Sequence, residues 1–426
     1  MKSCIATTMN AYGVIEHEKA NELINTYGSP LYIFNKDAFI DKYKQLLNTF
    51  RGIYNKYNIA YSFKTNYTPE ICKTVKQLGG LAEVVSDMEY RHAKKLGYKS
   101  KDIIFNGPVK GEALFEHLLE EGIANIDNLD EMKSVVSFAK QYPGKNFKIA
   151  YRVNIDVGQG YISRFGLDAY EDASMYSELN IAHEMLESVS NISLVGLHCH
   201  IGRSRNIEAW AKRTRIMFKL VDRLFVEPPK FIDFGSGMNS IMEPMLAEQF
   251  SGQIPTFDEY AKVVATAMQN KYGHLPYEEQ PILYTEPGTT VVSGSMSFIA
   301  TIKSIKTVKG KTYVTFDCSG GNIGDICHLK QLPITVYNNS SESIVCEKAN
   351  FVGYTCLEHD HIYQGYTGDI AVGDFVQFRN VGSYSNVFKP PFIAPNCAMI
   401  QIDKEGTTKI IKRKETIDDI FNTYVF

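Results

Sequence analysis

Short β-forming segments alternate with helical patterns over most of this chain, and this alternation constrains its fold more than any other feature. Eight such segments lie between about residues 34 and 291. Strands that alternate with helices form parallel sheets, and eight units of this length predict a (β/α)₈ TIM-type barrel. The expected strands are Ile59–Lys64, Leu81–Ser86, Ile103–Gly107, Ala124–Asn128, Phe147–Asn154, Ser193–His200, Phe231–Gly237 and Pro281–Gly288.

Helical periodicity fills the segments between these strands. Trp210, Met217 and Leu220 share one face of the expected helix Asn206–Phe225. Thr256-Phe-Asp-Glu259 has the pattern of a capping box, which predicts a helix from there through Met268. The other expected helices are Pro69–Leu78, Asp87–Leu96 and Leu129–Gln141.

The pattern changes to β structure after about residue 292. Phe298–Val308, a turn at Lys309-Gly-Lys311 and Thr312–Asp317 predict a hairpin. Further strands are expected at Phe375–Arg379 and at Ala398–Ile411, the latter bent at Glu405-Gly406. We therefore expect a barrel domain of residues 34–291 and a β domain made of residues 1–33 and 292–426.

Composition excludes several classes of partner. With 44% apolar and 22% charged residues, the 426-residue chain is an ordinary globular protein, and a net charge of −3 argues against nucleic acid or an anionic membrane as its main partner. The sequence shows no membrane-spanning run and no signal-peptide core near Met1. Its eight scattered cysteines form no Cys-x-x-Cys pair, which is typical of reduced thiols and predicts a cytoplasmic protein.

Lys64 is the residue that most directly suggests chemistry. It ends the first expected barrel strand, so its amine would reach the catalytic face of the barrel. Burial there would disfavour the ammonium form and make the amine a better nucleophile for an aldehyde. A lone lysine at a strand end is more often solvated, so the argument depends on the motifs that follow it.

Six ordered motifs together resemble one enzyme family. They are Tyr61-Ser-Phe-Lys64, His198-Cys-His200-Ile-Gly202, Asp233-Phe-Gly-Ser-Gly237, Glu286-Pro-Gly288, Cys356 with Asp360, and Gly382-Ser-Tyr384. This set resembles the fold type III pyridoxal-phosphate decarboxylases, which include the diaminopimelate, ornithine/lysine and carboxynorspermidine decarboxylases. The resemblance implies an alanine-racemase-like barrel with a C-terminal β domain, the cofactor pyridoxal 5′-phosphate, and α-decarboxylation of a small amino-acid substrate.

The resemblance also implies roles for individual residues. Lys64 would hold the cofactor covalently, and Glu286 would keep its ring nitrogen protonated. His200 would stack on the ring. Gly235, Ser236, Gly237, Gly288 and Tyr384 would contact the cofactor, the glycines by letting the backbone approach its phosphate. His198 and His200 share one face of a strand, and we expect no metal there because no carboxylate or cysteine ligand set accompanies them.

Cys356 is the second expected catalytic residue. In the family that this chain resembles, a cysteine at this position reaches the active site of the other subunit and reprotonates the α-carbon. The resemblance therefore implies a head-to-tail homodimer with shared sites. A lone cysteine is otherwise usually an inert, buried apolar residue.

Three departures from the family pattern bear on the substrate. The acidic residue that binds a distal ammonium is replaced by Leu357, with Glu358 and Asp360 as alternative acids. The arginine of Glu-Pro-Gly-Arg is replaced by Thr289. Arg203 stands where serine is usual, and we expect it to bind phosphate or a substrate carboxylate.

Two other functions fit the same fold. An amino-acid racemase would use a tyrosine of the β domain opposite the lysine, and the cysteine motif argues against it. A non-catalytic relative that binds the cofactor is the other alternative. The presence of Lys64, His200, Glu286 and Cys356 together argues for a working carboxy-lyase.

Overall fold

The computed structural model describes residues 13–324 and 326–426, which form two compact units. The barrel unit comprises residues 43–239 and 253–290. The β unit comprises the chain up to residue 42, residues 240–252 and residues 291–426. The assignment of residues 240–252 to the β unit differs from the continuous barrel segment that we expected.

Eight parallel strands close into a ring in the barrel unit. Their pairing order is β5-β4-β3-β2-β10-β9-β8-β6, and a β5–β6 pairing completes the circle. The predicted barrel with a separate β domain is confirmed. The eight strands are β2 (Tyr57–Ser62), β3 (Leu81–Val84), β4 (Ile103–Phe105), β5 (Ile123–Ile126), β6 (Phe147–Asn154), β8 (Ile192–His198), β9 (Phe231–Asp233) and β10 (Ile282–Thr285).

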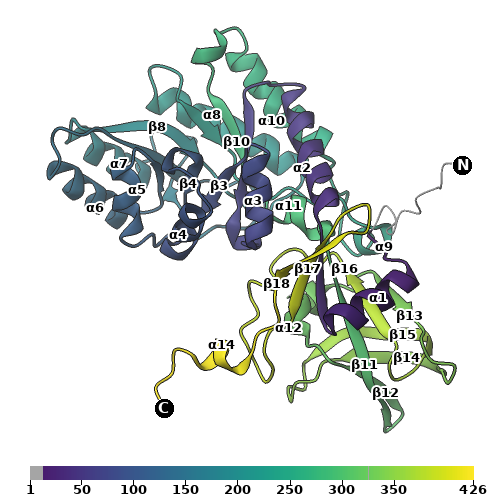
Figure 1. The fold of residues 1–426 in the computed structure, drawn as a ribbon. Coiled ribbons are helices and arrows are strands. Elements are labelled where there is room, and N and C mark those ends of the chain that lie inside the picture. The colour runs from purple at the N-terminus through teal and green to yellow at the C-terminus, as the bar shows by residue number, and fades with distance from the viewer. Residues whose placement is uncertain (1–12, 325) are drawn as a thin grey trace, which may run out of the picture. The chain divides into compact units, whose positions relative to one another are not determined.

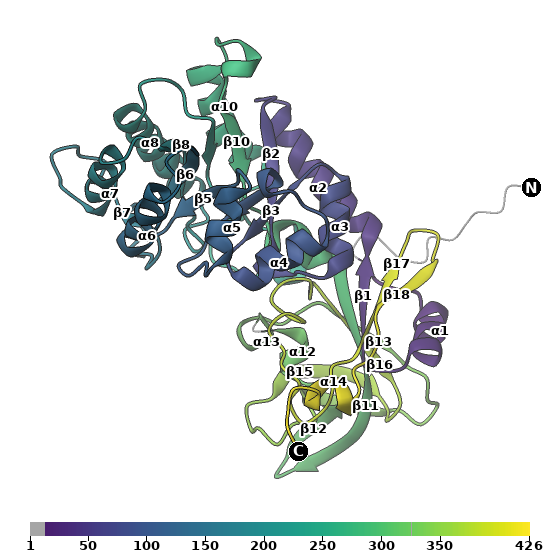
Figure 2. The same ribbon diagram turned by 60° about the vertical axis from the view of Figure 1, so that its left-hand side comes forward.

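Helices surround this ring on its outer face, as Figures 1 and 2 show. Thr256 caps α10 as its sequence predicts, because its hydroxyl accepts from the Glu259 N–H while the Glu259 carboxylate accepts from the Thr256 N–H. The helices of this unit are α3 (Pro69–Gln77), α4 (Asp87–Lys95), α5 (Ala113–Leu119), α6 (Leu129–Lys140), α7 (Glu178–Glu187), α8 (Ile207–Leu224) and α10 (Phe257–Tyr272), with a short strand β7 (Leu167–Asp168) beside β6.

Most barrel strands end two to four residues before the predicted positions. Lys64, for example, lies in a 3-10 turn (Phe63–Thr65) beyond β2, and Gly235 lies beyond β9. In two of these segments the composition does not change where the strand ends and the turn begins, so the sequence does not mark the end of the strand. They are Tyr61–Lys64 and Phe231–Gly237. These turns lie at the carboxyl ends of the strands, where barrel enzymes place their active sites.

The β unit is built around a long strand, β11, which pairs with β1, β12 and β16. The predicted hairpin and the strand near residue 375 are confirmed. The expected bent strand Ala398–Ile411 is instead two antiparallel strands, β17 and β18, and β13, β14 and β15 were not foreseen. The elements are α1 (His17–Tyr27), β1 (Leu31–Asn35), α9 (Pro244–Ala247), β11 (Met296–Val308), β12 (Lys311–Phe316), α12 (Gly320–Ile323), α13 (Ile326–Leu329), β13 (Ile334–Tyr337), β14 (Ile344–Val352), β15 (His361–Ile370), β16 (Phe375–Arg379), β17 (Ala398–Ile402), β18 (Thr408–Lys412) and α14 (Ile417–Phe421). Helices α2 (Lys36–Arg51) and α11 (Thr289–Val292) span the boundaries between the units.

A cluster of buried apolar side chains packs helix α1 and strand β1 against the rest of the β unit. Leu23 and Ile24 of α1 pack against Leu31, Ile299 and Ile400, all of them buried. Within the described part of the chain, no helix combines the length and apolar character needed to cross a membrane. The residues near Met1, which we expected to lack a signal peptide, lie outside the described residues.

Candidate active site

Lys64 projects into a cavity of about 270 Å³ in the barrel unit. Its Nζ donates hydrogen bonds to both carboxylate oxygens of Glu83, at 2.9 and 2.6 Å. The Lys64 side chain is 32% exposed, whereas the Glu83 side chain is fully buried. The expectation of a buried lysine was therefore wrong: the turn after β2 places the amine at the cavity, where an ion pair holds it.

Glu83 is a residue of the cavity that the sequence reasoning missed. Its carboxylate also accepts from the Ser62 hydroxyl at 2.5 Å and from Asn106 Nδ2 at 3.0 Å. It lies in the middle of the apolar run Leu81–Val84, and a carboxylate inside a barrel strand is a signal that could have identified it. Glu83 fixes the position of the Lys64 amine in the cavity.

Glu286 follows β10 and is 1% exposed. One carboxylate oxygen accepts from Asn106 Nδ2 at 2.5 Å, and the other accepts from His198 Nε2 at 3.0 Å. Burial acts to raise the pKa of Glu286, but His198 and the charge of Lys64 hold it well below its ordinary value. Glu286 is therefore an ionised carboxylate deep in the cavity.

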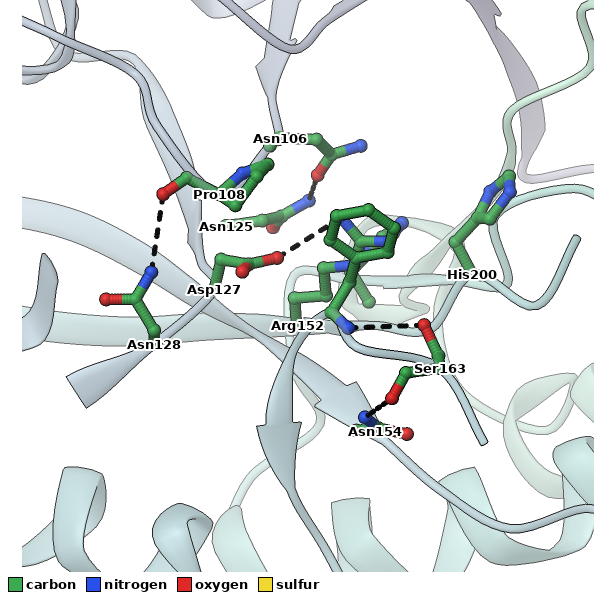
Figure 3. Close-up of polar contacts among 12 residues, drawn as sticks. Asn106, Pro108, Asn125, Asp127, Asn128, Arg152, Asn154, Ser163 and His200 are labelled. Atoms are coloured by element: carbon green, nitrogen blue, oxygen red, sulfur yellow. Dashed lines mark hydrogen bonds and ion pairs between the residues drawn. The ribbon is translucent and has the colours of Figure 1, made fainter. Parts of the chain in front are cut away.

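Asn106 connects the two carboxylates of the site. Because its amide nitrogen donates to both Glu83 and Glu286, it separates two negative charges that would otherwise repel each other. Its own Oδ1 accepts from Asn125 Nδ2 at 2.6 Å, and Figure 3 shows this pair on one wall of the site. A third buried carboxyl, Asp233, has a pKa raised well above its ordinary value by burial and by the charge of Glu286.

His198 and His200 both line the cavity and both face Glu286. His200 Nδ1 lies 3.6 Å from a Glu286 oxygen and accepts from the Ser236 N–H at 3.2 Å. Burial lowers the pKa of His200 to about 4, so its ring is neutral. The reason given for excluding a metal was wrong, because Glu286 does accompany the two histidines, with all three potential ligand atoms within 4.8 Å of one another.

The loop after β9 packs closely against the turn that carries His200. Gly235 and Gly237 have positive φ angles of +58° and +99°. A Cβ at Gly237 would lie 2.2 Å from the Ile201 carbonyl oxygen, and one at Gly288 would lie 2.0 Å from the Thr65 hydroxyl. Only glycine fits at these positions, where two loops approach at the mouth of the barrel.

Arg152 and two aromatic rings form another wall of the cavity. The Arg152 guanidinium lies 3.2 Å from Asp127 and 4.9 Å from the centre of the Phe165 ring. Figure 3 shows Arg152 and Asp127 on this wall, with His200 across from them. Arg203 is exposed, and its guanidinium lies 5.2 Å from the ring centre of Tyr161, which lines the cavity.

The remaining predicted residues belong to the β unit. Cys356 is an exposed free thiol, Leu357 is 43% exposed, and Glu358 is exposed. Asp360 is buried, and its two oxygens accept from the Gly320 N–H at 2.7 Å and the Thr355 hydroxyl at 2.5 Å, so it braces its own loop. Tyr384 is partly buried and has a φ of +53°, an unusual conformation for tyrosine.

Known proteins resemble this chain in sequence and in fold. Residues 37–293 match the family described as pyridoxal-dependent decarboxylase, pyridoxal binding domain. The diaminopimelate decarboxylase of Aquifex aeolicus is 25% identical, covering 95% of this chain and 94% of its own. That of Archaeoglobus fulgidus is 24% identical, covering 97% of each chain. The structure of the Methanocaldococcus jannaschii diaminopimelate decarboxylase in complex with L-lysine superposes with a TM-score of 0.80, at 23% identity over 97% of this chain and 95% of that one.

The pyridoxal binding domain of that family covers the barrel that holds Lys64 and Glu286, so the chain is an enzyme of the class that uses pyridoxal phosphate. This chain belongs to the pyridoxal-dependent decarboxylase family, and it is a carboxy-lyase that acts on an amino acid. Its residues fit the cofactor, because an amine and a buried carboxylate line one cavity, and the loop at Gly235, where a Cβ would lie 2.8 Å from His200, packs against that lining.

The neutral state of His200 leads to a prediction about pH. An unfolded histidine has a pKa near 6.5, whereas His200 in the fold has a pKa of about 4, so the unfolded state binds more protons between these values. Stability of the cofactor-free protein should therefore fall as the pH drops from about 6.5 to about 4, by roughly 1–3 kcal/mol from this residue. NMR titration should find His200 neutral at pH 5. An identical stability profile for His200→Asn would contradict the assignment.

Proposed function

We propose that the enzyme removes the α-carboxylate of an amino acid with Lys64 as the residue that holds the cofactor. The observation that carries this proposal is the hydrogen-bonded series Lys64–Glu83–Asn106–Glu286 along one cavity. It fixes a nucleophilic amine and an ionised carboxylate at two points of the same site. When bound, pyridoxal phosphate supplies the electron sink that accepts the bonding electrons as carbon dioxide leaves.

The residues around the cavity have separate tasks in this proposal. Glu286 keeps a proton on the ring nitrogen, since its own pKa is far below neutrality and the bound cation is the favoured partner. Neutral His200 stacks on the ring face without adding a positive charge. Gly235, Ser236, Gly237, Gly288 and Tyr384 hold the phosphate. Cys356 of a second subunit then delivers a proton to the α-carbon.

We further propose a cytoplasmic homodimer. The exposed thiol of Cys356 supports a role between subunits, because the other described cysteines are buried or half-buried. All seven described cysteines are free thiols, which supports a reducing compartment. The family resemblance at Cys356 supports the shared site.

The substrate is proposed to differ from that of the named relatives. Diaminopimelate carries a distal ammonium, but the position for its acidic partner is Leu357, and an unpaired ammonium loses several kcal/mol when it is desolvated, on the order of 2–5. Arg203 lies over Tyr161 on the cavity wall and is available to a distal carboxylate. We therefore propose an amino acid whose side chain is uncharged, carboxylated or a secondary amine, as in carboxynorspermidine-like molecules.

The covalent role of Lys64 can be tested by chemical trapping. The purified protein should be yellow, and borohydride should bleach it and attach the cofactor to the peptide that contains Lys64. Lys64→Ala should lose the attachment and the carbon dioxide release. Glu286→Gln should still be trapped at Lys64 but should release carbon dioxide at least about a hundredfold more slowly, because ring protonation is lost. A colourless protein that stays inert with added cofactor would contradict the proposal.

The shared site can be tested by mixing subunits. Lys64→Ala and Cys356→Ala should each be inactive, and their mixture should recover up to about a quarter of wild-type activity, since half of the dimers are hybrids with one intact site of two. Mass spectrometry must confirm that subunits exchange. No recovery after confirmed exchange would place Cys356 outside the shared site.

Substrate preference can be tested with four amino acids that separate two distal charges. 2-Aminopimelate has a distal carboxylate, lysine an ammonium, meso-diaminopimelate both and norleucine neither. We expect kcat/KM for 2-aminopimelate to exceed those for lysine and diaminopimelate by at least about tenfold, or 1.4 kcal/mol. Arg203→Gln should lower kcat/KM for 2-aminopimelate and leave kcat/KM for norleucine unchanged. Leu357→Glu should raise kcat/KM for lysine.

Arg164 provides the matched control for Arg203. It is also an exposed arginine stacked on a ring of the cavity wall, 4.1 Å from the centre of Phe165. If Arg164→Gln and Arg203→Gln lowered kcat/KM for 2-aminopimelate equally, the effect would come from the overall positive charge near the cavity rather than from a specific contact with Arg203. Efficient decarboxylation of lysine or diaminopimelate by the wild type would show that Leu357 does not set specificity.

A further inference from the structure

Arg213 is a fully buried cation that the chemistry described so far does not use. It belongs to α8 and is 0% exposed. Its guanidinium lies 4.2 Å from the Trp210 ring, and in the described part of the chain it forms no ion pair with any carboxylate. Burial lowers the pKa of Arg213 to about 10, so it keeps its charge at neutral pH. A buried cation without an anion is costly, and its presence calls for a reason.

The contacts of Arg213 link the two loops at the mouth of the barrel. Nη1 donates to the carbonyl oxygens of Phe234 at 2.8 Å and Ser236 at 2.9 Å, and Nη2 donates to that of Ile201 at 3.2 Å. The first two carbonyls belong to the loop after β9, and the third belongs to the turn after β8. Arg213 therefore lies on one side of both loops and draws their carbonyl groups toward it.

This orientation turns backbone donors away from Arg213. In a trans peptide unit the C=O and the following N–H point in opposite directions, so the N–H groups of Gly202, Gly235 and Gly237 face away from the guanidinium. Gly235 donates to Asp233 at 2.8 Å. Neither Gly202 nor Gly237 donates to another group within the described residues. Two free donors with a buried cation behind them form a site for an anion.

We propose that Arg213 supplies, from behind the loops, the positive charge toward the cofactor phosphate that Thr289 lacks. Arg213 is a positioning residue in this proposal, because it acts through the backbone rather than by contact. The inference rests on the proposed placement of the phosphate at Gly235–Gly237. It differs from the usual arrangement, in which an arginine after Glu-Pro-Gly contacts the phosphate directly.

Arg203 fits this role less well. Its guanidinium lies over Tyr161, which follows β6, whereas the glycine loops follow β9 and β10. In the barrel, β8 lies between β9 and β6, so Arg203 leans to the side opposite the glycine loops. The charge lost at position 289 and the charge at Arg203 therefore belong to different parts of the site.

The test compares pyridoxal phosphate with pyridoxal, which lacks the phosphate. Apoenzyme is titrated with each, and binding is followed by absorbance and by borohydride trapping at Lys64. Arg213→Met should weaken the phosphate-bearing ligand at least about tenfold and change pyridoxal by less than about twofold. Adding Thr289→Arg to this variant should restore the affinity for pyridoxal phosphate alone. Equal weakening of both ligands would show a structural brace and would overturn the proposal.

A second arm leaves Arg213 intact, in case its replacement prevents folding. If Arg213 already supplies the charge, Thr289→Arg in the wild-type background should tighten pyridoxal phosphate by less than about threefold. A gain of tenfold or more would show that the phosphate lacks a cation and would overturn the proposal. Failure of wild-type Lys64 to trap either ligand would instead overturn the placement of the cofactor itself, which separates the two hypotheses.

Discussion

The site depends on burying two carboxylates side by side, with a shared amide donor between them. Glu83 and Glu286 are both almost fully removed from solvent, and each would lose several kcal/mol of hydration, on the order of 3–5, without compensation. Asn106 donates to both, Lys64 neutralises the first, and His198 donates to the second. The Lys64 amine and the Glu286 carboxylate are thus held in place by one connected set of charges and hydrogen bonds.

The closed barrel makes this balance possible because it brings strand ends that are distant in sequence to one rim. Lys64 follows β2, Glu83 lies in β3, Asn106 follows β4, His198 ends β8 and Glu286 follows β10. Each residue belongs to the end of a different strand, so no single segment of the chain could form the site alone. The apolar strands below hold the rim rigid, and the polar groups need only small turns to reach the cavity.

The sequence predicted the features that follow from periodicity or from a local motif. It missed the features that depend on contacts between segments that are distant in the sequence. The eight strands and the capped helix at Thr256 followed from periodicity and local hydrogen bonding. Glu83 and Asn106 were missed because a polar residue in a short strand gives no sign of its partners. Strands β13 to β15 were missed because β12 pairs in parallel with β14, a contact between distant segments that no turn signals.

The missing arginine at Thr289 shows why residue identity alone is a weak guide to an anion site. A phosphate responds to the summed field of donors and charges around it, and that field can be built from a contacting side chain or from oriented peptide groups backed by a buried cation. Arg213 looks like an ordinary residue on a helix, and only the fold reveals that it faces three carbonyl groups of the glycine loops. In the proposed arrangement, the charge comes from a residue more than seventy positions before Thr289 in the sequence, and it acts at the same rim of the barrel.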